Sequence, residues 1–111
     1  MGSSSADMAR AVERRRDPRF ACGIGITMEW GAAAIEGHVV DLSAGGMFVE
    51  IAEPLWVGAR FQAQLAFEEP VKVECEVRRV QPLRGMALTY SVADSSGRIA
   101  IAAFLDKLRA S

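Results

Sequence analysis

The sequence has little of what most catalytic and metal sites require: its 111 residues include one histidine and two cysteines. This set cannot form a credible zinc shell, and we find no Ser/His/Asp set, paired catalytic carboxylates or P-loop. A strong excess of charge is also missing, because 13 Lys and Arg residues face 14 Asp and Glu residues for a net charge of −1. A general DNA or RNA binder needs a broad basic surface. We therefore expect no catalytic residues, no metal, no cofactor and no nucleic-acid partner.

Long apolar runs are absent as well. No segment approaches the roughly 20 apolar residues that cross a bilayer, and the N-terminus lacks the basic-then-apolar order of a signal peptide. We expect a cytoplasmic protein without membrane insertion. The chain length and the 50% hydrophobic content predict one domain with one core. We interpret residues 1–12 as a flexible leader and residues 13–111 as that domain.

The body of the chain has a hydrophobic period of two. Apolar and polar or small side chains alternate from Phe20 to Trp30, which predicts one long, half-buried strand. The same pattern predicts five further strands, at about residues 34–40, 47–51, 61–67, 71–77 and 86–90. Near the C-terminus the period changes to that of a helix, with apolar residues at Ile101, Phe104, Leu105 and Leu108 and N-cap candidates at Asp94, Ser95 and Ser96. We predict a mostly β fold: a six-stranded antiparallel β-barrel of Greek-key type with a C-terminal α-helix.

The two cysteines, Cys22 and Cys75, fall in phase with the apolar side of their strands. A reduced core thiol belongs at such a position, and a chain of this size needs no disulfide to fold. We predict two buried free thiols.

Residues 14–19, which read Arg-Arg-Arg-Asp-Pro-Arg, hold most of the local basic charge, and we call them the arginine arm. A guanidinium is a planar fork that fits a pair of phosphate oxygens or the O6/N7 edge of guanine. Several guanidinium groups on one short segment therefore suggest a nucleotide partner. The alternative is a solvated basic tail.

Residues 41–46, which read Asp-Leu-Ser-Ala-Gly-Gly, follow the second predicted strand, and we call them the glycine turn. Asp41 can accept hydrogen bonds from the N1–H and N2 amine of guanine, and Ser43 can donate or accept. Gly46 lets a ligand approach the backbone closely. The alternative is an Asx-type turn that bonds its own backbone, with Gly45 and Gly46 supplying positive φ angles.

Arg15-x-x-x-Arg19 before the first strand and Asp41-x-Ser43-x-x-Gly46 after the second resemble the two motifs of the PilZ domain, a bacterial receptor module for cyclic di-GMP. The resemblance extends from about Glu13 to Leu108. It implies the barrel with a C-terminal helix, and an arm that is mobile without ligand and closes over it.

The resemblance also implies the site residues. Arg15 and Arg19 would clamp the phosphates and guanine edges, while Asp41, Ser43 and Gly46 would form the floor. An arginine at position 14 resembles members that take an intercalated cyclic di-GMP dimer. Further candidates are Arg16 in the arm, Gly45 in the turn and Arg78 on the fifth strand, where some members stack a side chain on guanine.

The function we predict is a cyclic di-GMP receptor or adaptor that signals to an unidentified effector protein in trans. The alternative is a PilZ-like interaction module that works without the nucleotide. We interpret His38 as an exposed strand residue, and Trp30 and Trp56 as packing at one end of the barrel.

Overall fold

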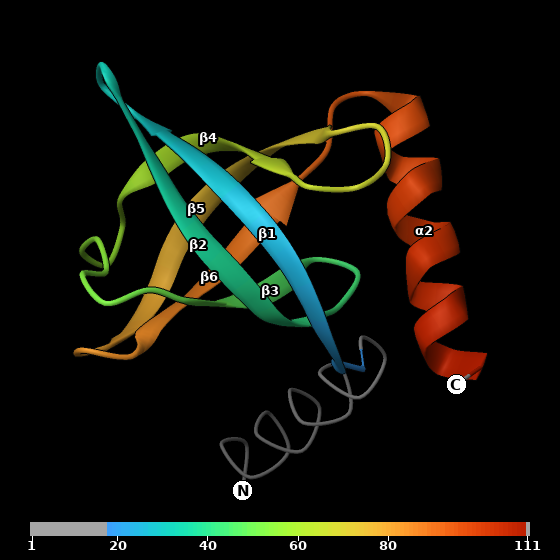
Figure 1. The fold of residues 1–111 in the computed structure, drawn as a ribbon, viewed down its shortest axis with the longest axis horizontal. Coiled ribbons are helices and arrows are strands. Elements are labelled where there is room, and N and C mark those ends of the chain that lie inside the picture. The colour runs from blue at the N-terminus through green and yellow to red at the C-terminus, as the bar shows by residue number, and fades with distance from the viewer. Residues whose placement is uncertain (1–17, 111) are drawn as a thin grey trace, which may run out of the picture.

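The computed structural model describes residues 18–110, which form six strands and one helix (Figure 1). Their bounds are β1 Phe20–Trp30, β2 Ala33–Leu42, β3 Gly46–Glu50, β4 Arg60–Leu65, β5 Val71–Gln81, β6 Gly85–Ser91 and α2 Ser95–Ala110. The predicted architecture is confirmed, and the predicted bounds of β1 are those observed.

The strands close into an antiparallel barrel in the order β1-β2-β3-β6-β5-β4. Two three-stranded meanders, β1 to β3 and β4 to β6, are joined because β3 pairs with β6 and β1 pairs with β4. Closure leaves each of these strands a partner on both sides, which removes exposed sheet edges. The connection from β3 to β4 crosses one end of the barrel, where the edge-to-face rings of Trp30 and Trp56 lie 5.0 Å apart.

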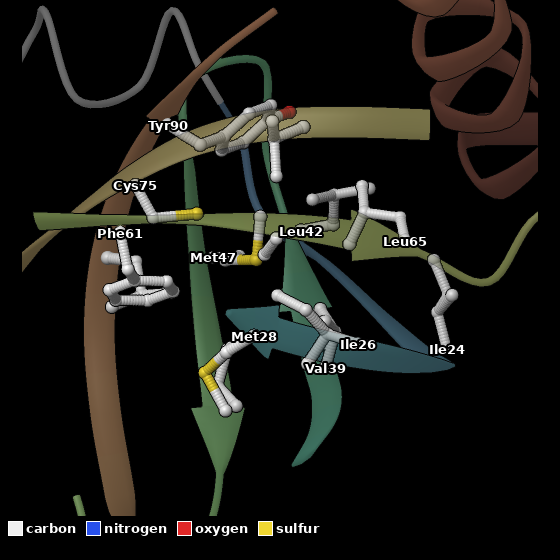
Figure 2. Packing of buried hydrophobic residues seen from close by; sticks show 14 of the residues in the cluster. Ile24, Ile26, Met28, Val39, Leu42, Met47, Phe61, Leu65, Cys75 and Tyr90 are labelled. Atoms are coloured by element: carbon white, nitrogen blue, oxygen red, sulfur yellow. The ribbon is translucent and has the colours of Figure 1, made fainter. Parts of the chain in front are cut away.

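The barrel interior is filled by the inward side chains that the period of two predicts. Ile26, Met28, Val39, Leu65 and Val77 are almost completely buried. Figure 2 shows this packing, with Tyr90 at the edge of the cluster.

Helix α2 packs along the outside of the barrel against β1 and β5 (Figure 1). Asp94 is its N-cap: its side chain accepts hydrogen bonds from the backbone N–H and hydroxyl of Ser96, and these bonds lower the pKa of the carboxyl. Phe67, predicted to lie in the fourth strand, is outside β4 and packs on Phe104 of α2 with ring centroids 5.1 Å apart. The alternating pattern could not distinguish packing inside the barrel from packing under the helix.

Both cysteines are free thiols. Cys75 is buried, and burial raises its pKa to about 12. Cys22 is only half-buried, near the end of β1 where its register against β2 shifts between Ala21 and Ile24, so the prediction of two buried thiols is confirmed for Cys75 alone. Among the residues described, no helix combines the length and apolar character needed to cross a membrane.

Candidate functional site

The end of β2 lies directly beside the start of β1. Phe20 pairs with Leu42, and Ala21 pairs with Asp41. Arg19 immediately precedes β1, and its guanidinium Nη1 lies 3.2 Å from Oδ1 of Asp41. The barrel thus brings a residue of the arginine arm into contact with a residue of the glycine turn, 22 positions later in the chain.

This ion pair is open to solvent: 48% of the Arg19 side chain and 33% of the Asp41 side chain are exposed. Exposed ion pairs of this kind contribute about 0–1 kcal/mol to stability, because water and salt screen them. The contact is therefore weak enough to be exchanged for a ligand.

Ser43 closes the glycine turn with both its backbone and its side chain. Its N–H donates to the carbonyl of Gly46 at 2.8 Å, and its hydroxyl donates to the same carbonyl at 3.1 Å. The hydroxyl also accepts from the Gly46 N–H at 3.1 Å. Ser43 is only 4% exposed. Because its one hydroxyl proton is engaged inside the turn, Ser43 acts here as part of the scaffold.

Tyr90 is a neighbour of the turn that sequence reasoning did not assign to the site. Its hydroxyl donates to the carbonyl of Ser43 at 2.6 Å, and its backbone N–H donates to the carbonyl of Gly45 at 3.0 Å. A tyrosine at an inward position of a strand was the available signal, because a buried phenol hydroxyl needs a hydrogen-bond partner. The pattern could not tell which carbonyl that partner would be.

The glycines of the turn are not used for left-handed backbone. In residues 18–110, positive φ angles occur at Gly31, Gly58 and Leu83 only, so Gly45 and Gly46 do not have the positive φ angles of the alternative interpretation as an Asx-type turn. A Cβ at Gly46 would lie 3.4 Å from Nη2 of Arg19. The Arg19 guanidinium therefore lies directly against Gly46, at a distance that leaves just enough space for a Cβ.

Cys22 lies near the same corner of the barrel and remains a thiol. Its sulfur donates weakly to the carbonyl of Val39 at 3.7 Å. Burial, and secondarily the negative charge of Asp41, raise the pKa of Cys22 above its ordinary value. A neutral thiol leaves Arg19 as the charged partner of Asp41.

Arg78 forms an ion pair within its own strand. Its guanidinium lies 3.7 Å from Glu76, and the register of β5 against β6 shifts between Val77 and Arg79, which places Arg78 at a bulge. Arg79, the next residue, lies in the same cross-strand row as Asp41. The row runs from Asp41 through its partner Phe48 and then Ala87 to Arg79. The predicted Arg14, Arg15 and Arg16, and the leader 1–12, lie outside the described residues.

Two surface hollows of the described residues do not include the glycine turn. The larger one, about 510 Å³, lies over β4, β5 and β6 and contains none of residues 41–46. At the apex of the glycine turn, Ala44 is exposed and Gly45 is half-buried. His38 is exposed, and residues 18–110 contain no group of three or more His, Cys, Asp or Glu side chains that could hold a metal ion.

Comparison with protein-family models matches residues 13–107 to the PilZ domain. Comparison with curated proteins gives no match.

Three solved structures illustrate the similarity of the fold. The inhibitor of motility MotI (DgrA) of Bacillus subtilis has a TM-score of 0.66 at 24% identity, over 85% of this chain and 52% of that one. The PilZ domain of CeSA from a cellulose-synthesizing bacterium has a TM-score of 0.61 at 16% identity, over 83% and 98%. The PilZ domain of Escherichia coli YcgR with c-di-GMP has a TM-score of 0.59 at 18% identity, over 86% and 92%. The chain spans about half the length of MotI.

Proposed function

The chain belongs to the PilZ domain family, and on this premise we propose that it binds cyclic di-GMP where the arginine arm meets the glycine turn. The observation that carries the proposal is the contact between Arg19 and Asp41. It joins the two motifs at one exposed point of the barrel. The solved YcgR domain with c-di-GMP supports the choice of ligand.

The charges of the site suggest how the ligand lies. A phosphodiester is repelled by the Asp41 carboxylate and attracted by the Arg19 guanidinium. We therefore place the donor edge of a guanine on Asp41 and a phosphate on Arg19. Asp41 then binds guanine and Arg19 binds a phosphate in place of each other. The ion pair that is lost contributes only about 0–1 kcal/mol to the stability of the protein.

The rest of the arm covers the ligand at the turn. We propose that Arg15 is the second clamp and that Arg14 and Arg16 add cationic planes for stacked bases. Arg14 then favours two cyclic di-GMP molecules per chain. Arg78 stays a candidate of lower rank, because in the structure it is directed to Glu76.

At the level of the cell, we propose a cytoplasmic receptor or adaptor without catalytic activity. Binding reorders the arm, and an effector protein in trans reads the altered surface. The second candidate, a nucleotide-independent interaction module, is favoured by the exposed apolar side chains of Trp56, Val57 and Leu83.

Calorimetric titration with cyclic di-GMP tests the proposal. We expect saturation at two ligands per chain, with binding that weakens as salt rises. Arg19→Ala should lose about 1–3 kcal/mol of binding free energy, as for removal of a charge-assisted contact. Arg84→Ala is the matched control: it removes an exposed arginine from the β5–β6 turn, at the other end of the barrel (Figure 1), and should bind normally.

The stoichiometry has its own variant. Arg14→Leu should reduce the ratio toward one ligand per chain while Arg15 and Arg19 keep appreciable affinity. One ligand per chain for both proteins would contradict the dimer. No binding by the unaltered chain would contradict the receptor function and favour the interaction module.

A further inference from the structure

Tyr90 lies on β6 with its ring among the inward side chains, at the edge of the barrel core (Figure 2). Apolar packing alone is served equally well by phenylalanine, because the two rings have the same shape. The hydroxyl has a specific partner, since its oxygen lies 2.6 Å from the Ser43 carbonyl oxygen.

The hydrogen bonds around Ser43 explain why the Ser43 carbonyl is free to accept from the Tyr90 hydroxyl. In a hairpin with a two-residue loop, the residues that flank the loop normally exchange both N–H···O bonds. Here the Ser43 N–H donates to the Gly46 carbonyl, but the Gly46 N–H donates to the Ser43 hydroxyl instead of the Ser43 carbonyl. The tyrosine and serine hydroxyls together therefore replace one backbone hydrogen bond of the turn.

This arrangement leaves two successive backbone donors at the apex. Within residues 18–110, the N–H groups of Ala44 and Gly45 have no hydrogen-bond acceptor, and Ala44 is exposed. Successive free N–H groups in a turn form a small concavity that attracts an anionic oxygen. The guanidinium of Arg19 lies over the adjacent Gly46, so positive charge is already present beside these donors.

We propose that Tyr90 is a positioning residue of the binding site. Its hydroxyl holds the Ser43 carbonyl, lets the Ser43 hydroxyl close the turn, and so presents the N–H groups of Ala44 and Gly45 to a phosphate oxygen of the ligand. The identity of the ligand in this inference rests on the proposed function. The role of Tyr90 in holding the turn does not, because it concerns the protein without ligand.

Tyr90→Phe removes the hydroxyl and keeps the ring. The matched control is Val73→Ala, which truncates a side chain on β5 that is as deeply buried but is not bonded to the turn. Ser43→Ala is the second variant, because it removes the other hydroxyl of the same device. Amide resonances of the three variants and the unaltered chain are followed by two-dimensional NMR, with hydrogen exchange and with cyclic di-GMP titration.

Without ligand, we expect the Gly46 N–H to exchange faster in Tyr90→Phe and Ser43→Ala than in Val73→Ala. With ligand, the Ala44 and Gly45 amide protons of the unaltered chain should shift downfield. Tyr90→Phe should bind about three- to tenfold more weakly, the effect of one neutral hydrogen bond. Tyr90→Phe and Ser43→Ala together should lose less than the product of their separate effects.

Unchanged Gly46 exchange and unchanged affinity in Tyr90→Phe would overturn the positioning role while leaving the receptor function intact. An equal loss of affinity in Val73→Ala would also overturn it, because general destabilisation would then account for the effect. If the unaltered chain binds no cyclic di-GMP, the receptor function fails and the ligand contact fails with it. The Gly46 exchange in Tyr90→Phe then still decides whether Tyr90 holds the turn.

Discussion

The β2–β3 turn and the β5–β6 turn connect neighbouring strands at opposite ends of the same barrel (Figure 1), yet they are held in opposite ways. The β2–β3 connection contains two consecutive glycines and no left-handed residue. The β5–β6 connection does contain a left-handed residue, and it is Leu83, with φ of 64°. Its turn is closed by a backbone bond from the Arg84 N–H to the Gln81 carbonyl at 3.0 Å.

None of the three glycines at these turns, Gly45, Gly46 and Gly85, has a positive φ, and only Gly85 lacks the space for a Cβ. At the β2–β3 turn, the Arg19 guanidinium lies against Gly46, and side chains from outside the turn hold its shape. At the β5–β6 turn, the sequence Pro82-Leu83 follows a type II pattern, in which proline presets the first angle and the second position requires a positive φ that leucine adopts only with strain. Leu83 is 89% exposed, so packing does not compensate for that strain.

The largest effect is expected at Gly85, which follows the β5–β6 turn. A Cβ there would collide with the backbone carbonyl of Val49 and approach the Phe48 ring to 2.8 Å. Because backbone must move, Gly85→Ala should lower the free energy of unfolding by about 3 kcal/mol. Urea unfolding followed by circular dichroism measures this change. If Gly85→Ala lowers the free energy of unfolding by less than an ordinary surface substitution does, lack of space for a side chain is not the reason for glycine at this position.

The next effect has the opposite sign. Leu83→Asn keeps the turn but places a residue that tolerates left-handed angles at φ of 64°. Nothing buried is lost, so the free energy of unfolding should rise by about 0.5–1 kcal/mol. The melting temperatures of the variant and the unaltered chain are compared. Pro82→Ala is measured beside them and is expected to lower the melting temperature. A lower melting temperature for Leu83→Asn would contradict the prediction, because it would show that contacts of the leucine side chain stabilise the fold more than its backbone strain destabilises it.

A smaller change in stability, with a larger change in binding, is expected at Gly46. The three atoms nearest to a Cβ there lie 3.4 to 3.5 Å away, in ordinary contact, and include Nη2 of Arg19. Gly46→Ala should fold almost normally, but it restricts the Arg19 guanidinium and should weaken cyclic di-GMP binding. Thermal unfolding and calorimetry are compared on the same protein. Equal affinity would show that Arg19 does not need the space over Gly46 when ligand is bound.

The smallest effect is expected one residue earlier. A Cβ at Gly45 would meet no atom within 4 Å, and the residue is not left-handed. Gly45→Ala should therefore leave the fold unchanged, or stabilise it by up to about 0.5 kcal/mol through the unfolded chain. This variant is the stability control for both Gly85→Ala and Gly46→Ala, and a clear loss of stability would contradict the spatial account.

The regular part of the fold could be predicted from periodicity alone. The alternation from Phe20 to Trp30 gave the bounds of β1, and the spacing around Ile101 gave the helix. Prediction ended β5 at about Val77, whereas the strand continues to Gln81. Two adjacent polar residues, Arg78 and Arg79, break the period of two, and a bulge absorbs the extra residue without ending the strand.

The site was predictable as a set of residue types but not as a set of contacts. The two motifs named Arg19 and Asp41 separately, and only the pairing of β1 with β2 puts them 3.2 Å apart. Ser43 was predicted as part of the floor of the site, and the motif did not specify that its hydroxyl bonds to both backbone groups of Gly46. Tyr90 was missed because its bond to Ser43 spans 47 positions, and no local pattern records so distant a partner.

The contact between the two ends of the described chain has a consequence for how this domain can be combined with others. The Arg109 guanidinium, in the last turn of α2, lies 6.0 Å from the centre of the Phe20 ring at the start of β1. A polypeptide that enters through β1 and leaves through α2 therefore enters and leaves at nearly the same place. Such a unit can be inserted into a surface loop of another protein without forcing that loop apart. The junction would then lie at the start of β1, directly beside Arg19 and its ion pair with Asp41.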